Sequence, residues 1–313
     1  MGRFRAWTLV ASLIFASMIA GTACAADPAP WRPAAGRTQI PIWPGEAPDL
    51  APVPGPETAS DGGVTNVTRP TMTVYSPTGK NTGAAVVVLP GGGFQMLAMD
   101  FEGTEICDWL TSKGVTCVLL KWRVPSIPYV WQCQCRPHNH DLSTPSVQDV
   151  QRTMRLVRAN AAKWGVDPHK IGVIGFSAGG FLVAEISTHF DTPLYQAIDA
   201  ADRESMRPDF AIAVYPGHLA MKDNDIVLAP EIADHITAKT PPTFLVQNED
   251  DDVDSIEDSL SYYMGLKKAG VPVELHAYAQ GGHAFGLRKK TLPVGVWPEL
   301  VEKWMASIGM IAP

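Results

Sequence analysis

The sequence carries little charge and no concentration of basic residues. Only 18% of its 313 residues are charged, and 25 Lys and Arg stand against 32 Asp and Glu, which gives a net charge of −7. No block of Lys and Arg could follow a phosphate backbone, so nucleic acid is not an expected partner. No internal repeat is visible. With 46% hydrophobic residues, the composition excludes a disordered or collagen-like chain and indicates a folded globular protein.

Long apolar runs are also scarce, and the one at the N-terminus has the form of an export signal. Two Arg residues precede an apolar run over residues 6–20, and small residues follow it. This order predicts a signal peptide cleaved after Ala25 or Ala26, and hence a periplasmic or secreted protein that does not associate with the membrane after cleavage. A retained anchor is one alternative, although the run is short for a span of roughly 20 residues. A lipoprotein at Cys24 is another, but Gly21 stands where a large aliphatic residue is needed.

Cysteine is rare, with five in the whole chain, and four of these follow the predicted signal: Cys107, Cys117, Cys133 and Cys135. An even number in an exported protein favours disulfides, for which three pairings are possible. The segment 133–141 also combines two Cys with two His, so a zinc site is the alternative. No other ligand spacing supports it, and no metal is expected.

Beyond the signal, short apolar segments alternate with helical patterns. We predict a signal peptide over 1–25, an extended lead-in over 26–63 that lies on the surface, and one catalytic domain over 64–313. The predicted strands are 71–75, 84–89, 115–120, 171–175, 210–214, 243–247 and 273–277. The predicted helices are 101–112, 146–164, 178–190, 255–269 and 297–308. This alternation predicts an α/β fold, with a mostly parallel central sheet covered by helices on both faces and the reactive site beyond the carboxyl ends of the strands.

The most informative segment is 171–180, where an apolar strand runs into Gly-Phe-Ser-Ala-Gly and an apolar helix follows. In this context the motif predicts a nucleophile elbow with Ser177 as the nucleophile. An earlier strand ends in Pro-Gly-Gly-Gly, whose backbone N–H groups can approach a substrate oxygen. We expect an oxyanion hole from the amides of Gly92, Gly93 and Ala178, and which glycine donates stays open.

Two later strands are followed by candidates for the acid and the base of a catalytic triad. Asp250, Asp251 and Asp252 follow the strand over 243–247, and His283 follows the strand over 273–277 in a glycine-flanked loop. Hydrolases with a nucleophile elbow place the acid and then the His after the Ser in chain order. His283 is therefore the candidate base, and the acid is one of the three Asp residues.

Several stretches together carry a resemblance to a known family. They are Ile-Trp-Pro-Gly at 42–45, Pro-Gly-Gly-Gly-Phe at 90–94, Lys-Trp-Arg-Val-Pro at 121–125, Trp-Gly-Val-Asp-Pro at 164–168, Gly-Phe-Ser-Ala-Gly-Gly at 175–180 and Gly-Gly-His-Ala-Phe-Gly at 281–286. In these stretches the chain resembles secreted bacterial α/β-hydrolases of the group that includes acetyl xylan esterases and feruloyl-esterase-like enzymes, which is related to the hydrolase domain of prolyl oligopeptidases. The resemblance covers nearly all of the sequence after the signal, and it implies Asp251 as the acid, beside Ser177 and His283.

The residues and the resemblance predict a secreted serine esterase that needs no cofactor and forms an acyl-enzyme at Ser177. Its expected substrates are short acyl esters, acetyl above feruloyl, of small molecules or of oligosaccharides from hemicellulose. We expect Trp122, Tyr129 and Trp131 to bind the sugar, because aromatic faces flanked by polar groups suit a sugar ring. The alternative is that these aromatics only pack their loop against the domain.

Three other functions stay open from the sequence. A feruloyl esterase or a prolyl-oligopeptidase-like serine peptidase would use the same residues, although a peptidase of that type normally carries an additional propeller domain. A binding module that keeps the fold without the chemistry would not need Ser177, Asp251 and His283 together. The oligomeric state is not predicted.

Overall fold

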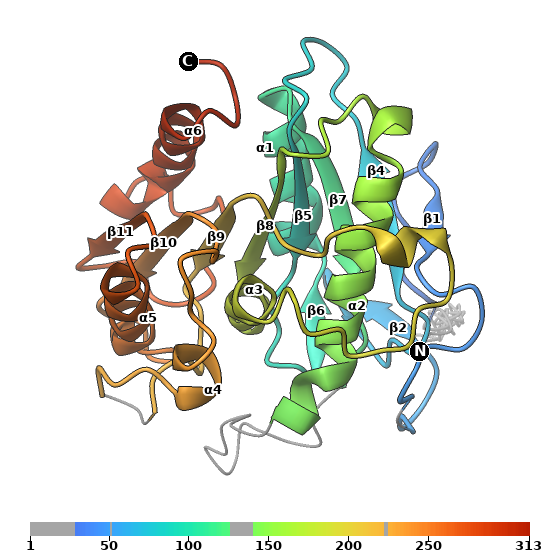
Figure 1. Cartoon of the computed structure of the whole chain (residues 1–313), viewed down its shortest axis with the longest axis horizontal. Helices are drawn as coiled ribbons and strands as arrows, with labels where there is room; N and C mark the ends of the chain where they lie inside the picture. Colours follow the sequence, from blue (N-terminus) through green and yellow to red (C-terminus); the bar gives the residue numbers. More distant parts are fainter. Residues whose placement is uncertain (1–28, 51, 126–139, 222–224) are drawn as a thin grey trace, which may run out of the picture.

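A central eight-stranded sheet organises the protein (Figure 1). The computed structural model describes residues 29–50, 52–125, 140–221 and 225–313, with the backbone alone for 140–143. The strand order is β1-β4-β7-β5-β8-β9-β10-β11; the strands from β7 to β11 in this order are parallel, and β4 is antiparallel to both of its neighbours. The strands are β1 (Gln39–Pro41), β4 (Thr71–Tyr75), β5 (Ala85–Leu89), β7 (Thr116–Lys121), β8 (Ile171–Phe176), β9 (Ala211–Val214), β10 (Thr243–Asn248) and β11 (Val273–Tyr278). The predicted mostly parallel sheet in a single α/β domain is confirmed.

The predicted strands agree with the observed ones to within one residue at each end, and of the eight strands in the central sheet only the short strand β1 was not predicted. The agreement has a simple reason. Strands β5, β7, β8, β9 and β10 are buried along their whole length, so each reads in the sequence as an apolar run with polar residues, where present, only at its ends.

Helices cover both faces of the sheet. In Figure 1, α2 and α3 lie in front of the strands and α1 lies behind them. The rings of Trp109 in α1 and Trp297 in α6 are 5.6 Å apart, which puts these two helices side by side. Helix α2 begins at His140, earlier than predicted, and ends at Ala159 before a short separate helix. The helices are η1 (Asp100–Thr104), α1 (Glu105–Ser112), α2 (His140–Ala159), η2 (Ala161–Trp164), α3 (Ala178–Thr188), η3 (Ala200–Arg203), α4 (Pro230–Ala233), α5 (Ile256–Lys268), η4 (Pro293–Val296) and α6 (Trp297–Ser307).

The lead-in is more than a surface segment, which corrects our expectation. Its strand β1 extends the main sheet, and the side chains of Ile42 and Trp43 are buried in the core. The indole N–H of Trp43 donates to Oδ1 of Asp149 in α2 at 2.7 Å. Farther along, β2 (Thr58–Ser60) and β3 (Gly63–Thr65) join β6 (Met96–Ala98) in a small antiparallel sheet. The early residues therefore help to complete the domain.

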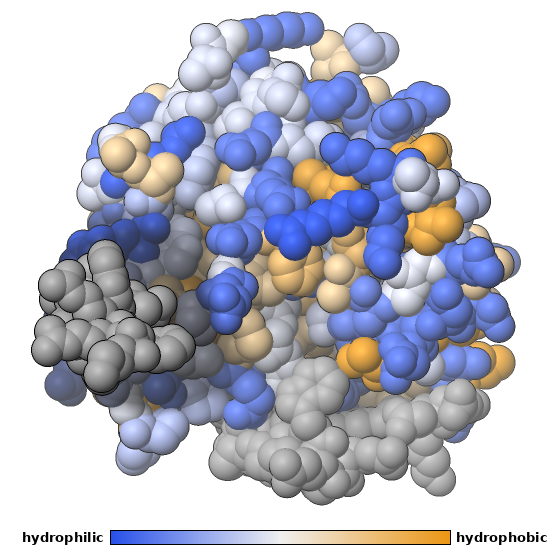
Figure 2. All heavy atoms as spheres, turned by 180° about the vertical axis from the view of Figure 1, so that it is seen from behind, coloured by the Kyte–Doolittle hydropathy of each residue, from blue (hydrophilic) through white to orange (hydrophobic). Residues whose placement is uncertain are grey.

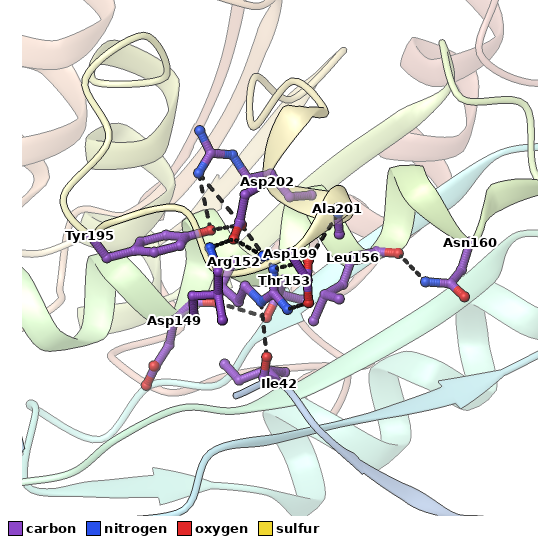
Figure 3. A network of polar contacts seen from close by, with 12 residues as sticks. Ile42, Asp149, Arg152, Thr153, Leu156, Asn160, Tyr195, Asp199, Ala201 and Asp202 are labelled. Atoms are coloured by element: carbon purple, nitrogen blue, oxygen red, sulfur yellow. Dashed lines mark hydrogen bonds and ion pairs between the residues drawn. The ribbon is translucent and has the colours of Figure 1, made fainter. Parts of the chain in front are cut away.

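A buried ionic network ties the lead-in to the helical layer (Figure 3). Arg152 in α2 donates to the carbonyl of Ile42 at 3.0 Å and pairs with Asp199 and Asp202 at 2.5 and 2.8 Å. The Tyr195 hydroxyl donates to Asp202 as well. The side chains of Arg152 and Asp202 are 2% and 0% exposed, so each of these buried charges needs a close counter-charge.

Replacing Arg152 by Met should lower the free energy of unfolding by about 3–5 kcal/mol, because the buried Asp202 carboxylate loses its main counter-charge. Urea denaturation of both proteins measures the difference. The matched control is Arg288→Met, which removes an exposed pair with Glu105 and should cost about 1 kcal/mol or less. Equal effects of the two substitutions would contradict the importance of the buried network.

One disulfide links α1 to the sheet. Cys107 in α1 and Cys117 in β7 are bonded, with 5.2 Å between their Cα atoms. This agrees with the expectation that the cysteines form disulfides. Cys133, Cys135 and His138 lie outside the described residues, so the zinc alternative for this segment is untested. Within the described ranges, no group of three or more His, Cys, Asp or Glu is placed to hold a metal ion.

The surface seen from behind is mostly hydrophilic, with hydrophobic side chains in separate small patches (Figure 2). Among the residues that the structure describes, no helix is both long enough and apolar enough to cross a bilayer. The predicted signal peptide over 1–25, with its anchor and lipoprotein alternatives, lies outside these residues.

Candidate active site

Ser177 stands on a sharp turn between β8 and α3. Its backbone has φ 52° and ψ −119°, a strained conformation for a residue with a side chain. The turn also brings backbone atoms very close together: a Cβ on Gly175 would lie 2.1 Å from the carbonyl oxygen of Gly179, and one on Gly179 would lie 2.1 Å from that of Leu89. Only glycine fits at these two positions, which explains the motif around Ser177 physically.

The structure pairs His283 with Asp251. Nδ1 of His283 lies 3.0 and 2.8 Å from the two carboxylate oxygens of Asp251, whose side chain is fully buried. The backbone N–H groups of Val253 and Asp254 donate to the same carboxylate. Because a carboxylate only accepts, Nδ1 of the neutral imidazole carries the proton, and Nε2 is left as the basic nitrogen. Of the three acidic candidates, Asp251 is the one that contacts the imidazole. Asp250 instead accepts a hydrogen bond from the N–H of Gly282, and Asp252 is exposed.

Ser177 and the imidazole of His283 both lie close to a second carboxylate, that of Asp254. The Ser177 hydroxyl donates to Oδ2 of Asp254 at 3.1 Å, and Nε2 of His283 lies 3.7 Å from the same oxygen. The hydroxyl and the basic nitrogen therefore lie near one point, at the carboxyl ends of β8 and β11. To give its proton to His283, the hydroxyl must turn away from Asp254.

The surroundings of His283 favour its charged form. Burial lowers the pKa of the imidazole, but the hydrogen bond to Asp251 and the charges of Asp254, Asp251 and Glu102 outweigh burial and raise the pKa above 6.5. The ring of Tyr215 packs edge-on against the imidazole at 4.9 Å. An imidazole that accepts a proton readily is suited to act as a general base.

The glycine-rich loop after β5 lies against Ser177. A Cβ on Gly91 would lie 3.0 Å from Cβ of Ser177, so the two backbones are in close contact. The N–H of Gly91 donates to Oε2 of Glu102 at 2.7 Å, so this amide is already used and does not point at a substrate oxygen. Gly92 and Gly93 both have positive φ angles, of 132° and 59°. Their amides, with that of Ala178 at the start of α3, stay the candidates for the oxyanion hole.

Glu102 is a buried residue that sequence reasoning missed. Its Oε1 accepts from the hydroxyl of Tyr215 at 2.8 Å, and that hydroxyl in turn accepts from the N–H of Gly286 at 3.3 Å. The chain of contacts joins the glycine-rich loop of Gly91 to the loop of His283. Burial raises the pKa of Glu102 to about 7, although the hydrogen bonds from Tyr215 and Gly91 oppose the rise.

The raised pKa of Glu102 predicts a pH-dependent stability. The folded protein keeps a proton on this carboxyl that the unfolded chain, with a pKa near 4.5, releases between pH 4.5 and 7. The stability contributed by this proton is complete below pH 4.5 and is lost as the pH rises through 7. The wild type should therefore lose about 3 kcal/mol of its free energy of unfolding between pH 4.5 and 8 through this group, whereas Glu102→Gln, which has no proton to release, should not.

Urea denaturation at several pH values tests this, with Glu105→Gln as the control, because Glu105 is partly exposed and only three positions from Glu102. The difference between the control and the wild type should stay nearly constant. The same constancy for Glu102→Gln would contradict the raised pKa.

Of the three aromatic residues predicted to bind the sugar, the structure describes only Trp122. Trp122 has no exposed surface: its indole N–H donates to the carbonyl of Pro90 at 3.1 Å, and its ring packs on Phe94 at 5.6 Å. Trp122 therefore supports the glycine-rich loop from beneath, and its proposed contact with substrate is wrong because core packing takes its whole surface. Tyr129 and Trp131 lie outside the described residues, and their role stays a prediction.

The fold and this site define the chain as an α/β-hydrolase. The prolyl oligopeptidase family matches residues 138–308. This match covers more than half of the chain, and the chain belongs to that family.

The chain is also similar to individual proteins whose activities are named. The chain is 28% identical to an acetylxylan esterase of Xylanibacter ruminicola over 73% of its length, and 26% identical to endo-1,4-beta-xylanase B of Butyrivibrio fibrisolvens over 63%. It spans only 45% and 32% of the lengths of these two proteins. Among solved structures, an acetyl ester-xyloside bifunctional hydrolase from Caldicellulosiruptor lactoaceticus is 33% identical with a TM-score of 0.70, covering 88% of this chain and 97% of its own.

Proposed function

We propose that this protein is an exported serine esterase that removes acetyl groups from oligosaccharides derived from hemicellulose. The observation that carries the proposal is the pairing of Asp251 with His283 next to Ser177 on its strained turn. A serine so placed, with a basic nitrogen nearby and backbone amides around it, is equipped for acyl transfer. The names of the acetylxylan esterase and of the acetyl ester-xyloside hydrolase support the acetyl group and the xylan-derived alcohol.

In the proposed mechanism, Nε2 of His283 takes the proton of Ser177 as its Oγ attacks the ester carbonyl. Asp251 holds the imidazole in the tautomer that leaves Nε2 free and stabilises the positive charge that forms. Amides of Gly92, Gly93 and Ala178 stabilise the oxyanion. His283 then gives its proton to the departing alcohol, and water, activated by the same nitrogen, releases the acid. No cofactor enters these steps.

Export is part of the proposal and depends on the predicted signal peptide over 1–25. The disulfide between Cys107 and Cys117 supports it, because such bonds persist in oxidising compartments. We also propose that residues 26–63 and 64–313 act as one catalytic unit, since Ile42 and Trp43 are buried in the same core as the sheet.

A substrate panel tests the proposal. We expect kcat/KM to be highest for acetylated xylo-oligosaccharides and to fall from aryl acetate through butyrate to octanoate, with feruloylated sugars below acetylated ones. Preference for octanoate, or no activity on any acetylated sugar, would contradict it. Cleavage of prolyl amides would favour the peptidase alternative, and inactivity on every compound together with no labelling by an organophosphonate would favour a binding module.

A further inference from the structure

A second carboxylate, that of Asp254, lies beside the proposed nucleophile. Asp251 contacts Nδ1 of His283, whereas Asp254 approaches Nε2, on the other side of the ring. The side chain of Asp254 is only 8% exposed, and its Oδ2 accepts the hydrogen bond of Ser177. The proposed mechanism gives this carboxylate no role.

The surrounding loop holds Asp254 in place. Its N–H donates to Oδ1 of Asp251 at 3.0 Å, and its carbonyl accepts from Nε2 of Gln247 at 2.6 Å. On the other side, a Cβ on Gly217 would lie 2.2 Å from Oδ1 of Asp254, so the carboxylate packs directly against the glycine backbone. Asp254 is thus a built part of the site rather than a side chain that reaches in from solvent.

The chemistry of the reaction leaves Oδ2 of Asp254 without its donor. Once Ser177 directs its proton to His283, this buried oxygen loses its hydrogen bond, and Nε2 of His283, 3.7 Å away, is too far to form a hydrogen bond in its place. The departing alcohol receives its proton from Nε2 of His283, so the alcohol must bind on the side where Oδ2 lies, 3.7 Å from Nε2. A hydroxyl on the carbon next to the esterified one would be within reach of Oδ2 and would replace the lost donor.

We propose that Asp254 determines specificity for the alcohol half of the substrate by accepting a hydrogen bond from a free hydroxyl next to the ester. The enzyme then prefers esters of polyols and sugars that keep such a neighbouring hydroxyl. It disfavours alcohols with an anionic group at that position, because like charges repel in a buried site. This inference rests on the proposed esterase function and specifies its substrate class.

Two small esters that differ only by a methyl group on the second oxygen test the proposal: 2-hydroxyethyl acetate and 2-methoxyethyl acetate. They share the acetyl group and the position of the second oxygen, but only the first can donate. The wild type should show a kcat/KM at least about tenfold higher for the hydroxyl compound, as expected for a hydrogen bond to a charged group. Asp254→Ala should bring this ratio close to one, whereas Asp252→Ala, an exposed acid of the same loop, should leave it unchanged.

The outcomes separate the two proposals. If both esters are hydrolysed with equal kcat/KM, or if Asp254→Ala keeps the preference, the role of Asp254 is overturned and the esterase function stands. If the wild type hydrolyses neither these esters nor aryl acetate, the esterase function itself fails. Should Asp254→Ala not fold, Asp254→Leu keeps the approximate size of the side chain without a hydrogen-bond acceptor, and a ratio equal to that of the wild type would overturn the proposal.

The pH dependence of kcat/KM is a second measurement, and it would not change if Asp254 had only a structural role. The groups facing the imidazole of His283 are Asp251, Asp254, Glu102 and the ring of Tyr215, and the charge of Asp254 helps to raise the pKa of His283. Only neutral His283 can accept the Ser177 proton, so kcat/KM falls as the pH drops below this pKa. Asp254→Asn should shift this acid limb to lower pH, and an unshifted limb would contradict the placement of the charge.

Discussion

Replacing Ser177 by Ala should abolish ester hydrolysis, with a loss of kcat on the order of 10⁶ by comparison with other serine hydrolases that lack their nucleophile. The reason is that Ala has no oxygen with which to form the covalent acyl-enzyme. The elbow should survive, since Ala has the same Cβ as Ser in the strained φ of 52°. Initial rates on aryl acetate, with circular dichroism to check the fold, measure the effect.

A hydrolysis rate within tenfold of the wild type would refute Ser177 as the nucleophile. Ser187 in α3 provides a matched control, because it is also buried but follows the elbow by more than two helical turns. Ser187→Ala should retain ester hydrolysis near the level of the wild type.

The Asp251→Asn variant should lose roughly 10⁴-fold in kcat, the cost of holding the catalytic His in the wrong tautomer in a comparable triad. Two backbone N–H groups already point at Asp251, so an Asn here would keep its carbonyl oxygen toward them and turn its NH₂ group toward His283. Nδ1 would then have to accept, and the proton would move to Nε2, where it blocks general base catalysis.

Its neighbours in the loop are natural controls. Asp252→Asn should change kcat little because Asp252 is exposed. Asp250→Asn should have a moderate effect through the N–H of Gly282, next to His283. If either of these substitutions proved more damaging than Asp251→Asn, the assignment of the acid would be wrong.

Much of the fold could be read from the sequence because its strands are buried on both faces. A strand such as β5 or β8 has no polar side to interrupt its apolar run, and glycines mark the turn that follows each of them. Short edge elements carried no such signal. Strand β1 has only three residues, none of them fully buried, and the burial of Trp43 depends on a partner 106 positions away in the chain.

The sequence by itself determined the chemistry that depends on local backbone geometry. Ser177 could be found because the turn around it tolerates only glycine at 175 and 179, and His283 because it follows a late strand in a glycine-flanked loop. The residues alone left three consecutive acids open, and the family resemblance implied Asp251; the tertiary structure shows that Asp251 contacts His283. Only the tertiary structure decided that Asp254 lies beside Ser177 and that Trp122 is buried beneath Pro90. The physical reason is that these relations are distances between side chains on different strands and loops. No periodicity or spacing along one segment encodes them, and the packing of β8, β10 and β11 sets them.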